Sequence, residues 1–115
     1  MSDVSPPVAY EHFAGVDMRI GVIVEVQDFP RARKPSYKLR IHFGDTIGDR
    51  WSSAQVAHYA IEDLIGRQVI AVINLPPRNI AGFMSECLVL GVPTAEGTVS
   101  LLAPTLPPVI GGRVY

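Results

Sequence analysis

The central stretch of the chain, from Asp17 to Gly44, alternates apolar and polar residues with the two-residue period of extended backbone. In the first half the apolar set is Met18, Ile20, Val22, Val24 and Val26. In the second half Tyr37, Leu39, Ile41 and Phe43 alternate with Lys38, Arg40 and His42. We therefore expect two strands, each with one buried and one exposed face, and a basic exposed face on the second strand.

A basic turn joins these two predicted strands. Pro30 and Pro35 bracket it, and each proline fixes one φ angle and removes one backbone donor. Between them lie Arg31, Arg33 and Lys34. The sequence therefore predicts a stiff hairpin loop with a positive tip.

The rest of the chain predicts further short elements separated by glycine and proline. These are a short helix within residues 8–16 with Phe13 packed inward, a third strand at 50–56, a helix of about two turns that ends at Gly66, and strands at 68–75, 86–92, 98–103 and 111–115. One helix after the third strand, without strand–helix alternation, is typical of an all-β oligonucleotide/oligosaccharide-binding (OB) fold, a five-stranded barrel with short helices. We assign residues 1–12 to an N-terminal lead with the start of the first helix, and residues 13–115 to the barrel domain.

The composition indicates one hydrophobic core, and the absence of targeting and membrane patterns indicates where the protein is located. Hydrophobic residues make up 48% of the 115 positions, which is ample for one core. No apolar run approaches the roughly 20 residues of a membrane span, and the N-terminus lacks a signal-peptide pattern. We therefore expect a cytoplasmic protein without membrane insertion. The net charge is −1, yet five of the ten Lys and Arg residues lie between Arg31 and Arg40, which indicates a local basic patch.

Catalytic and metal-binding chemistry finds little support in the sequence. Cys87 stands before Leu88 and Val89, which favours a small buried side chain over a nucleophile. The histidines show no ligand spacing, and no nucleophile motif or phosphate-binding glycine loop is present. We expect no enzymatic activity, no cofactor and no metal.

Two segments are candidates for binding. The basic hairpin could contact phosphates, with Tyr37 or Trp51 offering a stacking face; alternatively it is a solvated loop. The segment from Pro76 to Ser85 could frame a ligand groove, with donors from Arg78 and Asn79 and an adaptable apolar surface from Phe83 and Met84. Alternatively, those two apolar side chains plug the barrel or form a dimer contact.

The motifs FPRARKPSYKLRIHFG, WSSAQV and NLPPRNIAGFMSECLVLGV resemble the CsaA family of secretion-associated chaperones, within the wider tRNA-binding domain family. The resemblance covers about residues 13–115. It implies an OB fold, a homodimer, and two kinds of ligand, namely tRNA or structured RNA and unfolded or precursor polypeptide. Two places depart from the family pattern: Trp51 and Ser52 stand where a more basic pair is expected, and Ala81 and Gly82 replace a Gly-Pro pair.

Residues and resemblance together give two sets of candidate site residues. The RNA-binding set is Arg31, Arg33, Lys34, Lys38, Arg40, Asn74, Arg78 and Ser85, and the peptide-binding set is Phe83, Met84, Trp51 and Leu75. We expect a homodimeric, chaperone-like protein for exported or unfolded polypeptides, joined through its N-terminal helix region and its apolar tail (residues 101–114). The alternative is a structure-specific tRNA-binding protein acting in trans.

Overall fold

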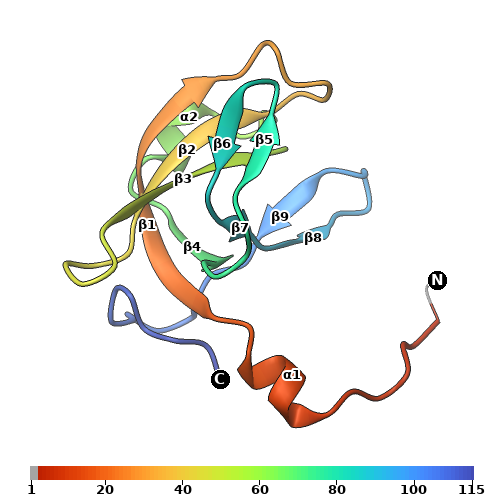
Figure 1. Ribbon diagram of the computed structural model, residues 1–115. Coiled ribbons are helices and arrows are strands. Elements are labelled where there is room, and N and C mark those ends of the chain that lie inside the picture. The colour runs from red at the N-terminus through yellow and green to blue at the C-terminus, as the bar shows by residue number, and fades with distance from the viewer. Residues whose placement is uncertain (1–2) are drawn as a thin grey trace.

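A five-stranded antiparallel sheet with strand order β3-β2-β1-β4-β7 forms the body of the protein in the computed structural model, which describes residues 3–115 (Figure 1). Its strands are β1 (Met18–Asp28), β2 (Tyr37–His42), β3 (Asp49–Ala54), β4 (Gln68–Val72) and β7 (Leu88–Val89). Two hairpins flank the sheet, β5 (Arg78–Ile80) with β6 (Phe83–Ser85) and β8 (Gly91–Pro93) with β9 (Val99–Leu101). The helices are α1 (Tyr10–Ala14) and α2 (Ile61–Leu64), the second lying between β3 and β4 as predicted.

The sheet curls into a nearly closed barrel because β3 meets the residues that precede β7. Glu86 donates its amide to the carbonyl of Trp51 at 2.7 Å, and its carboxylate accepts the Trp51 amide at 2.8 Å. Next to this pair, Ser52 Oγ donates to the carbonyl of Cys87 at 2.8 Å. The predicted all-β barrel with short helices is confirmed.

The core confirms the alternation predicted for β2. Leu39 and Ile41 are fully buried and Phe43 is 1% exposed, while the side chains between them face outward. Around them pack Ile23, Val56, Leu64, Val69, Ala71 and Cys87. Leu64 on α2 covers the end of the core, so this short helix is held by packing.

The prediction of one apolar face for β1 is wrong because a β-bulge interrupts the strand. Ile23 pairs with Ile41 and Glu25 pairs with Arg40, so Val24 is an extra residue without a partner. The alternation therefore changes face, and Ile23 is fully buried whereas Val24 is 40% exposed.

The C-terminal segment pairs with the edge of β1 near its start, before the point where β2 begins to pair with this strand. Gly111 donates to the Ile20 carbonyl at 2.8 Å, and the Ile20 amide donates to Gly112 at 3.0 Å. Ile20 itself is 8% exposed. The strand predicted at 111–115 is reduced to one isolated bridge between Arg19 and Arg113.

Several other predicted boundaries also differ. The two-turn helix is only Ile61–Leu64, the strand predicted at 68–75 ends at Val72, and the strand predicted at 86–92 is divided between β7 and β8.

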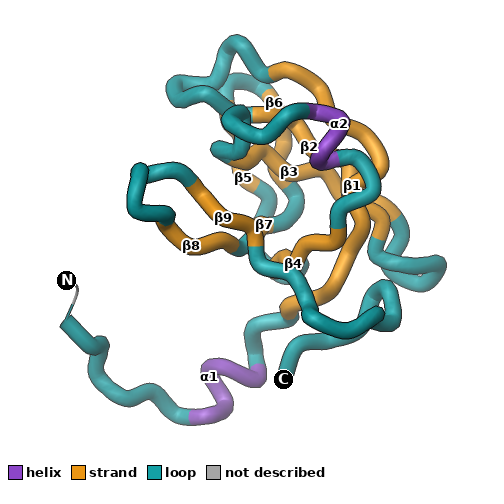
Figure 2. Tube along the Cα trace, turned by 180° about the vertical axis from the view of Figure 1, so that it is seen from behind, coloured by secondary structure: helices purple, strands orange, loops and turns teal. Residues whose placement is uncertain are grey.

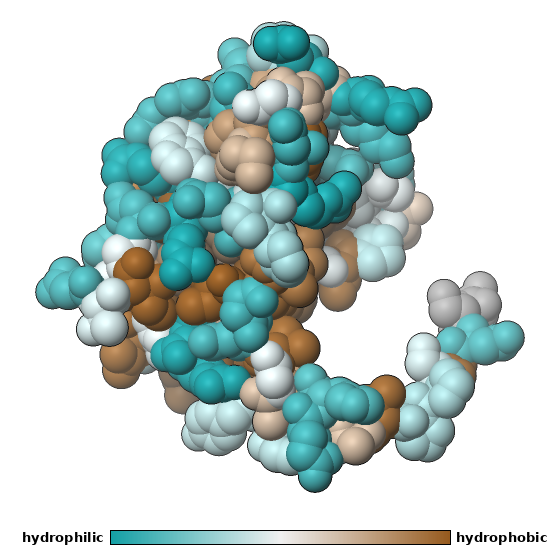
Figure 3. Space-filling view, in the orientation of Figure 1, coloured by the Kyte–Doolittle hydropathy of each residue, from teal (hydrophilic) through white to brown (hydrophobic). Residues whose placement is uncertain are grey.

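The N-terminal arm, residues 3–14, extends away from the barrel (Figures 1 and 2). Helix α1 contains no buried residue, and Phe13, predicted to pack inward, is 40% exposed. Figure 3 shows open space between the arm and the body. The predicted lead is thus an extended segment in its described part, whereas residues 1 and 2 lie outside the described residues. Within residues 3–115, no helix combines the length and the apolar character needed to cross a membrane.

Candidate binding groove

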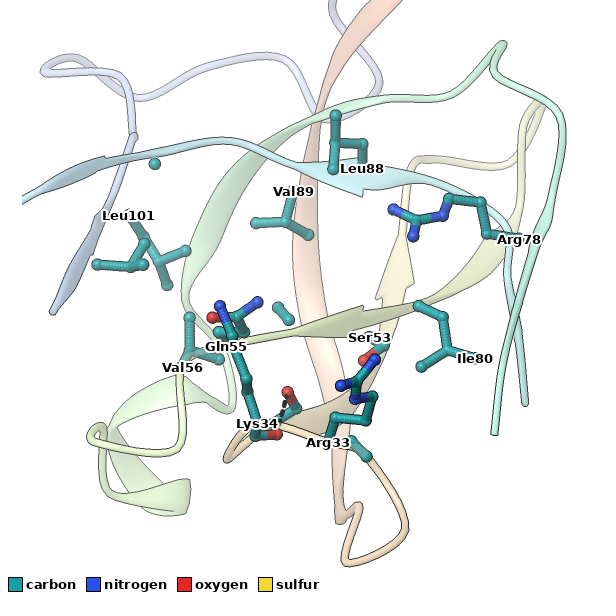
Figure 4. A pocket seen from close by; sticks show the side chains of 15 residues that line it. Arg33, Lys34, Ser53, Gln55, Val56, Arg78, Ile80, Leu88, Val89 and Leu101 are labelled. Atoms are coloured by element: carbon teal, nitrogen blue, oxygen red, sulfur yellow. Dashed lines mark hydrogen bonds between the residues drawn. The ribbon is translucent and has the colours of Figure 1, made fainter. Parts of the chain in front are cut away.

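An open groove of about 810 Å³ lies beside the end of β3. Its walls come from the β1–β2 loop, the end of β3, hairpin β5–β6, strand β7 and hairpin β8–β9. Figure 4 shows Arg78 and Ile80 toward one end and Leu101 toward the other, with Val89 and Gln55 between them. Apolar walls and several polar groups thus converge on one space.

Three cationic side chains reach this groove from two segments. Arg33 and Lys34 come from the β1–β2 loop and Arg78 comes from β5, whereas no carboxylate lines the groove. In the described part of the chain none of the three forms an ion pair. The structure therefore brings these three predicted site residues together, while Arg31 lies exposed on the same loop outside the groove.

The exposed face of β2 is less basic than its sequence indicates. Arg40 pairs with Glu25 at 2.9 Å and also with Asp49, and Asp49 bonds His42 at 2.7 Å. Hydrogen bonds from Gln27 and then Arg40 lower the pKa of Glu25, and those from His42 and Arg40 lower the pKa of Asp49. Carboxylates from the neighbouring strands thus neutralise Arg40, which does not line the groove.

Lys38 belongs to an aromatic cluster on the outside of the barrel. Its Nζ atom lies 4.9 Å from the ring centre of Phe29 and 5.0 Å from that of Phe83. Phe83 in turn meets Trp51 edge to face, with ring centres 6.0 Å apart. Lys38, Phe83 and Trp51 therefore hold hairpin β5–β6 against β2 and β3, and none of them lines the groove.

Hairpin β5–β6 presents two different faces. Its two-residue turn has positive φ at Ala81 (50°) and Gly82 (87°), and Asn79 Oδ1 accepts the Gly82 amide at 2.9 Å. Arg78 and Ile80 line the groove. Asn79 and Met84, which pair with each other across the two strands, occupy the alternate positions and therefore lie on the other face of the hairpin. Met84 is 48% exposed and faces away from the groove.

Asn74, predicted to bind RNA, anchors the N-terminal arm. Its side-chain amide donates to the carbonyl of Gly15 at 2.8 Å, and its Oδ1 accepts the Asp17 amide at 2.8 Å. Arg113 adds a bond to the Ala14 carbonyl at 2.7 Å. Both ends of the Asn74 side chain are therefore engaged within the protein.

Ser85 and Leu75 also lie outside the groove. Ser85 is buried, accepts the Ser53 amide at 3.2 Å and donates to the Cys87 carbonyl at 3.3 Å. Leu75 is 46% exposed just beyond the end of β4. Ser85 thus closes the barrel, which is a structural task.

Cys87 is 5% exposed, which confirms the prediction of a small buried side chain. Burial raises the pKa of its thiol to about 12, so the thiol stays protonated at neutral pH. Among residues 3–115, no three His, Cys, Asp or Glu side chains gather where they could hold a metal ion.

The opposite wall of the groove has no signal in the sequence. Hairpin β8–β9 is held in place by His58, whose Nε2 lies 2.8 Å from the Val99 carbonyl, and by Tyr59, whose hydroxyl accepts the Leu101 amide at 3.2 Å. These side chains are some forty residues away in the chain, so no local pattern indicates the contact.

Comparison with known proteins agrees with this fold. A family model described as a putative tRNA binding domain matches residues 18–112. The structure superposes on the CsaA chaperone protein from Picrophilus torridus with a TM-score of 0.90 and 47% identity, over 95% of this chain and 100% of that one. For chaperone CsaA from Bacillus anthracis the TM-score is 0.88 with 44% identity, over 96% and 100% of the two chains. The methionine–tRNA ligase of Porphyromonas gingivalis is 34% identical over 112 residues, and the match covers 96% of this chain but only 16% of the ligase.

Proposed function

The chain belongs to the tRNA-binding domain family, and from this premise we propose that it is a non-catalytic, chaperone-like protein that binds exported or unfolded polypeptide. The groove is the observation that carries the proposal. Its apolar walls suit the aliphatic side chains that an unfolded chain exposes, and its cations suit acidic residues nearby. The similarity to two CsaA chaperone structures supports the same function. A cytoplasmic location stays a prediction from the sequence.

A matched pair of variants on hairpin β5–β6 tests the groove. Ile80 lines it and Met84 faces away, although both belong to the same small hairpin. We expect I80S to weaken the binding of a labelled apolar peptide several-fold, and M84S to leave it unchanged, as measured by fluorescence anisotropy. Equal losses in the two variants would place polypeptide binding elsewhere on the protein.

RNA binding is the second candidate, and the unpaired charges of the β1–β2 loop support it. Arg33 and Lys34 have no acidic partner in the described part of the chain, and Arg31 is exposed beside them. The double variant R33A/K34A should weaken tRNA binding and reduce the salt dependence by about one unit of slope per lost phosphate contact. If the slope of log affinity against log salt does not change, the loop is not an RNA site.

One titration separates the two candidates. A mixed tRNA pool and an apolar peptide are measured against the same preparation over a range of salt concentrations. Peptide binding that salt barely affects, with weak RNA binding, supports the chaperone-like function. Tight, steeply salt-dependent RNA binding without a peptide signal would replace it by the tRNA-binding function.

We further propose a homodimer joined through the N-terminal arm and the C-terminal tail. Val8 and Tyr10 on the arm are each 71% exposed, and Leu106 and Val109 on the tail are 77% and 80% exposed. Apolar surface of this kind favours a partner. Mass measurement in solution at micromolar concentration should give a dimer that Y10S weakens. A monomeric mass for the unmodified protein would refute the proposal.

A further inference from the structure

We propose that the groove binds polypeptide by strand addition to the free edge of β3. One residue of an extended segment, running parallel to β3, donates to the carbonyl of Ser53 and accepts from the amide of Gln55. The inference rests on the proposed polypeptide-binding function and specifies how the backbone is recognised.

The edge of β3 carries backbone groups that the protein leaves unused. The Ser53 amide donates to Ser85 Oγ, on the side of β3 that faces away from β2. Each strand residue directs its amide and its carbonyl to the same side, so the Ser53 carbonyl lies on this outer edge. The amide of Gln55, the residue after β3, points the same way because a trans peptide directs it opposite to the carbonyl of Ala54, which pairs with Tyr37 on β2. In the described part of the chain the Gln55 amide has no hydrogen-bond partner, and the Ser53 carbonyl receives only a 3.5 Å contact from Ser52 Oγ.

This pair of groups favours a parallel orientation. An antiparallel residue opposite Ser53 would form only one of its two bonds, because the Ser53 amide already donates to Ser85 Oγ. A parallel residue instead uses the carbonyl of one residue and the amide of the residue two positions later. Ser53 and Gln55 offer this combination, and both line the groove.

The walls of the groove complement an extended chain in shape and charge. A segment along β3 would place alternate side chains toward apolar groups such as Val89 and Leu101. Arg33, Lys34 and Arg78 border the same space without any carboxylate. The expected ligand is therefore an extended polypeptide with alternating apolar and acidic residues.

Replacing Gln55 by proline removes the bonding amide without disturbing the local backbone. The Val56 amide donates to the Ala54 carbonyl across Gln55 at 2.9 Å, which defines a γ-turn, and Gln55 is not among the residues with positive φ. An inverse γ-turn has a central φ near −75°, within the range of proline. Q55A is the matched control because it shortens the side chain and keeps the amide.

The experiment measures a labelled peptide that alternates leucine and glutamate against the full chain and both variants. We expect Q55P to bind the peptide about tenfold more weakly than Q55A, as for the loss of roughly 1.4 kcal/mol, because the two variants lack the same side chain and differ in the amide. In the same assay, the peptide is N-methylated at one position at a time. We expect a similar loss of binding at a single position, because the amide of that residue donates to the Ser53 carbonyl.

Each outcome decides between the two proposals. Peptide binding that is equal in Q55P and Q55A and indifferent to every N-methyl group refutes strand addition and leaves the polypeptide-binding function standing. No binding of the peptide to the unmodified protein overturns both. If circular dichroism shows that Q55P is unfolded, the N-methyl series on the unmodified protein decides alone.

Discussion

Barrel closure gives a sharp prediction, because one buried carbonyl holds β3 and β7 together through two serine side chains. The Cys87 carbonyl accepts from Ser52 Oγ at 2.8 Å and from Ser85 Oγ at 3.3 Å. Ser52 is fully buried and Cys87 is 5% exposed, so water cannot easily replace either donor. Removing one donor leaves the other in place, whereas removing both leaves a buried acceptor unsatisfied.

The expected losses of stability follow from this difference between removing one donor and removing both. We expect S52A to lower the free energy of unfolding by about 1 kcal/mol, the net value of a typical hydrogen bond, and S85A by about 2 kcal/mol, because Ser85 Oγ also accepts the Ser53 amide. The double variant S52A/S85A should lose at least 1 kcal/mol more than the sum of the single changes, because the orphaned carbonyl adds a desolvation cost of about 1–3 kcal/mol. Each kcal/mol corresponds to a fall in Tm of about 4 °C in a domain of this size.

Urea unfolding of the four proteins at one protein concentration measures the coupling. Additivity within about 0.5 kcal/mol would refute the reasoning, since it would mean that water or another donor reaches the carbonyl. The same variants test the RNA interpretation of Ser85. Because its hydroxyl is buried and engaged, S85A should leave tRNA affinity unchanged.

Other predictions follow from single contacts. G21A should destabilise the fold by about 1–3 kcal/mol in urea unfolding, because a Cβ at Gly21 would lie 2.5 Å from Cγ2 of Ile41; an unchanged midpoint would contradict this packing. The hydrogen bond from Arg19 lowers the pKa of Asp17, so Asp17 adds stability above its ordinary pKa of about 4, and this stability is lost as the pH falls below that value. D17N should therefore lose less unfolding free energy than the unmodified protein as the pH is lowered. Identical curves of unfolding free energy against pH for the two proteins would refute this prediction. R40Q should leave the salt slope of RNA binding unchanged because Arg40 is already paired; a slope reduced by about one unit would return it to the RNA site.

The hydrophobic alternation of β2 and the order of elements along the chain were sufficient to predict the barrel. Both depend on local periodicity, which the sequence displays directly, and Leu39 and Ile41 are buried as this periodicity requires. The basic loop could be predicted as well, because Pro30 and Pro35 restrict it and its charges are adjacent in the chain.

Only the tertiary structure decided which predicted site residues are available to a ligand. Glu25 and Asp49, on the two strands beside β2, neutralise Arg40. Asn74 bonds the residue that follows the N-terminal arm, and Ser85 bonds β3 where the barrel closes. These partners are distant in sequence, so residue type alone cannot indicate that a side chain is already satisfied.

The groove itself is also a product of the tertiary structure. Its far wall depends on His58 and Tyr59, which hold the β8–β9 hairpin in place. The sequence by itself determined the order of the main elements, the core pattern of β2 and the supply of positive charge. Packing between segments far apart in the chain decided where that charge stays free, because burial and pairing depend on neighbours that only the folded chain brings together.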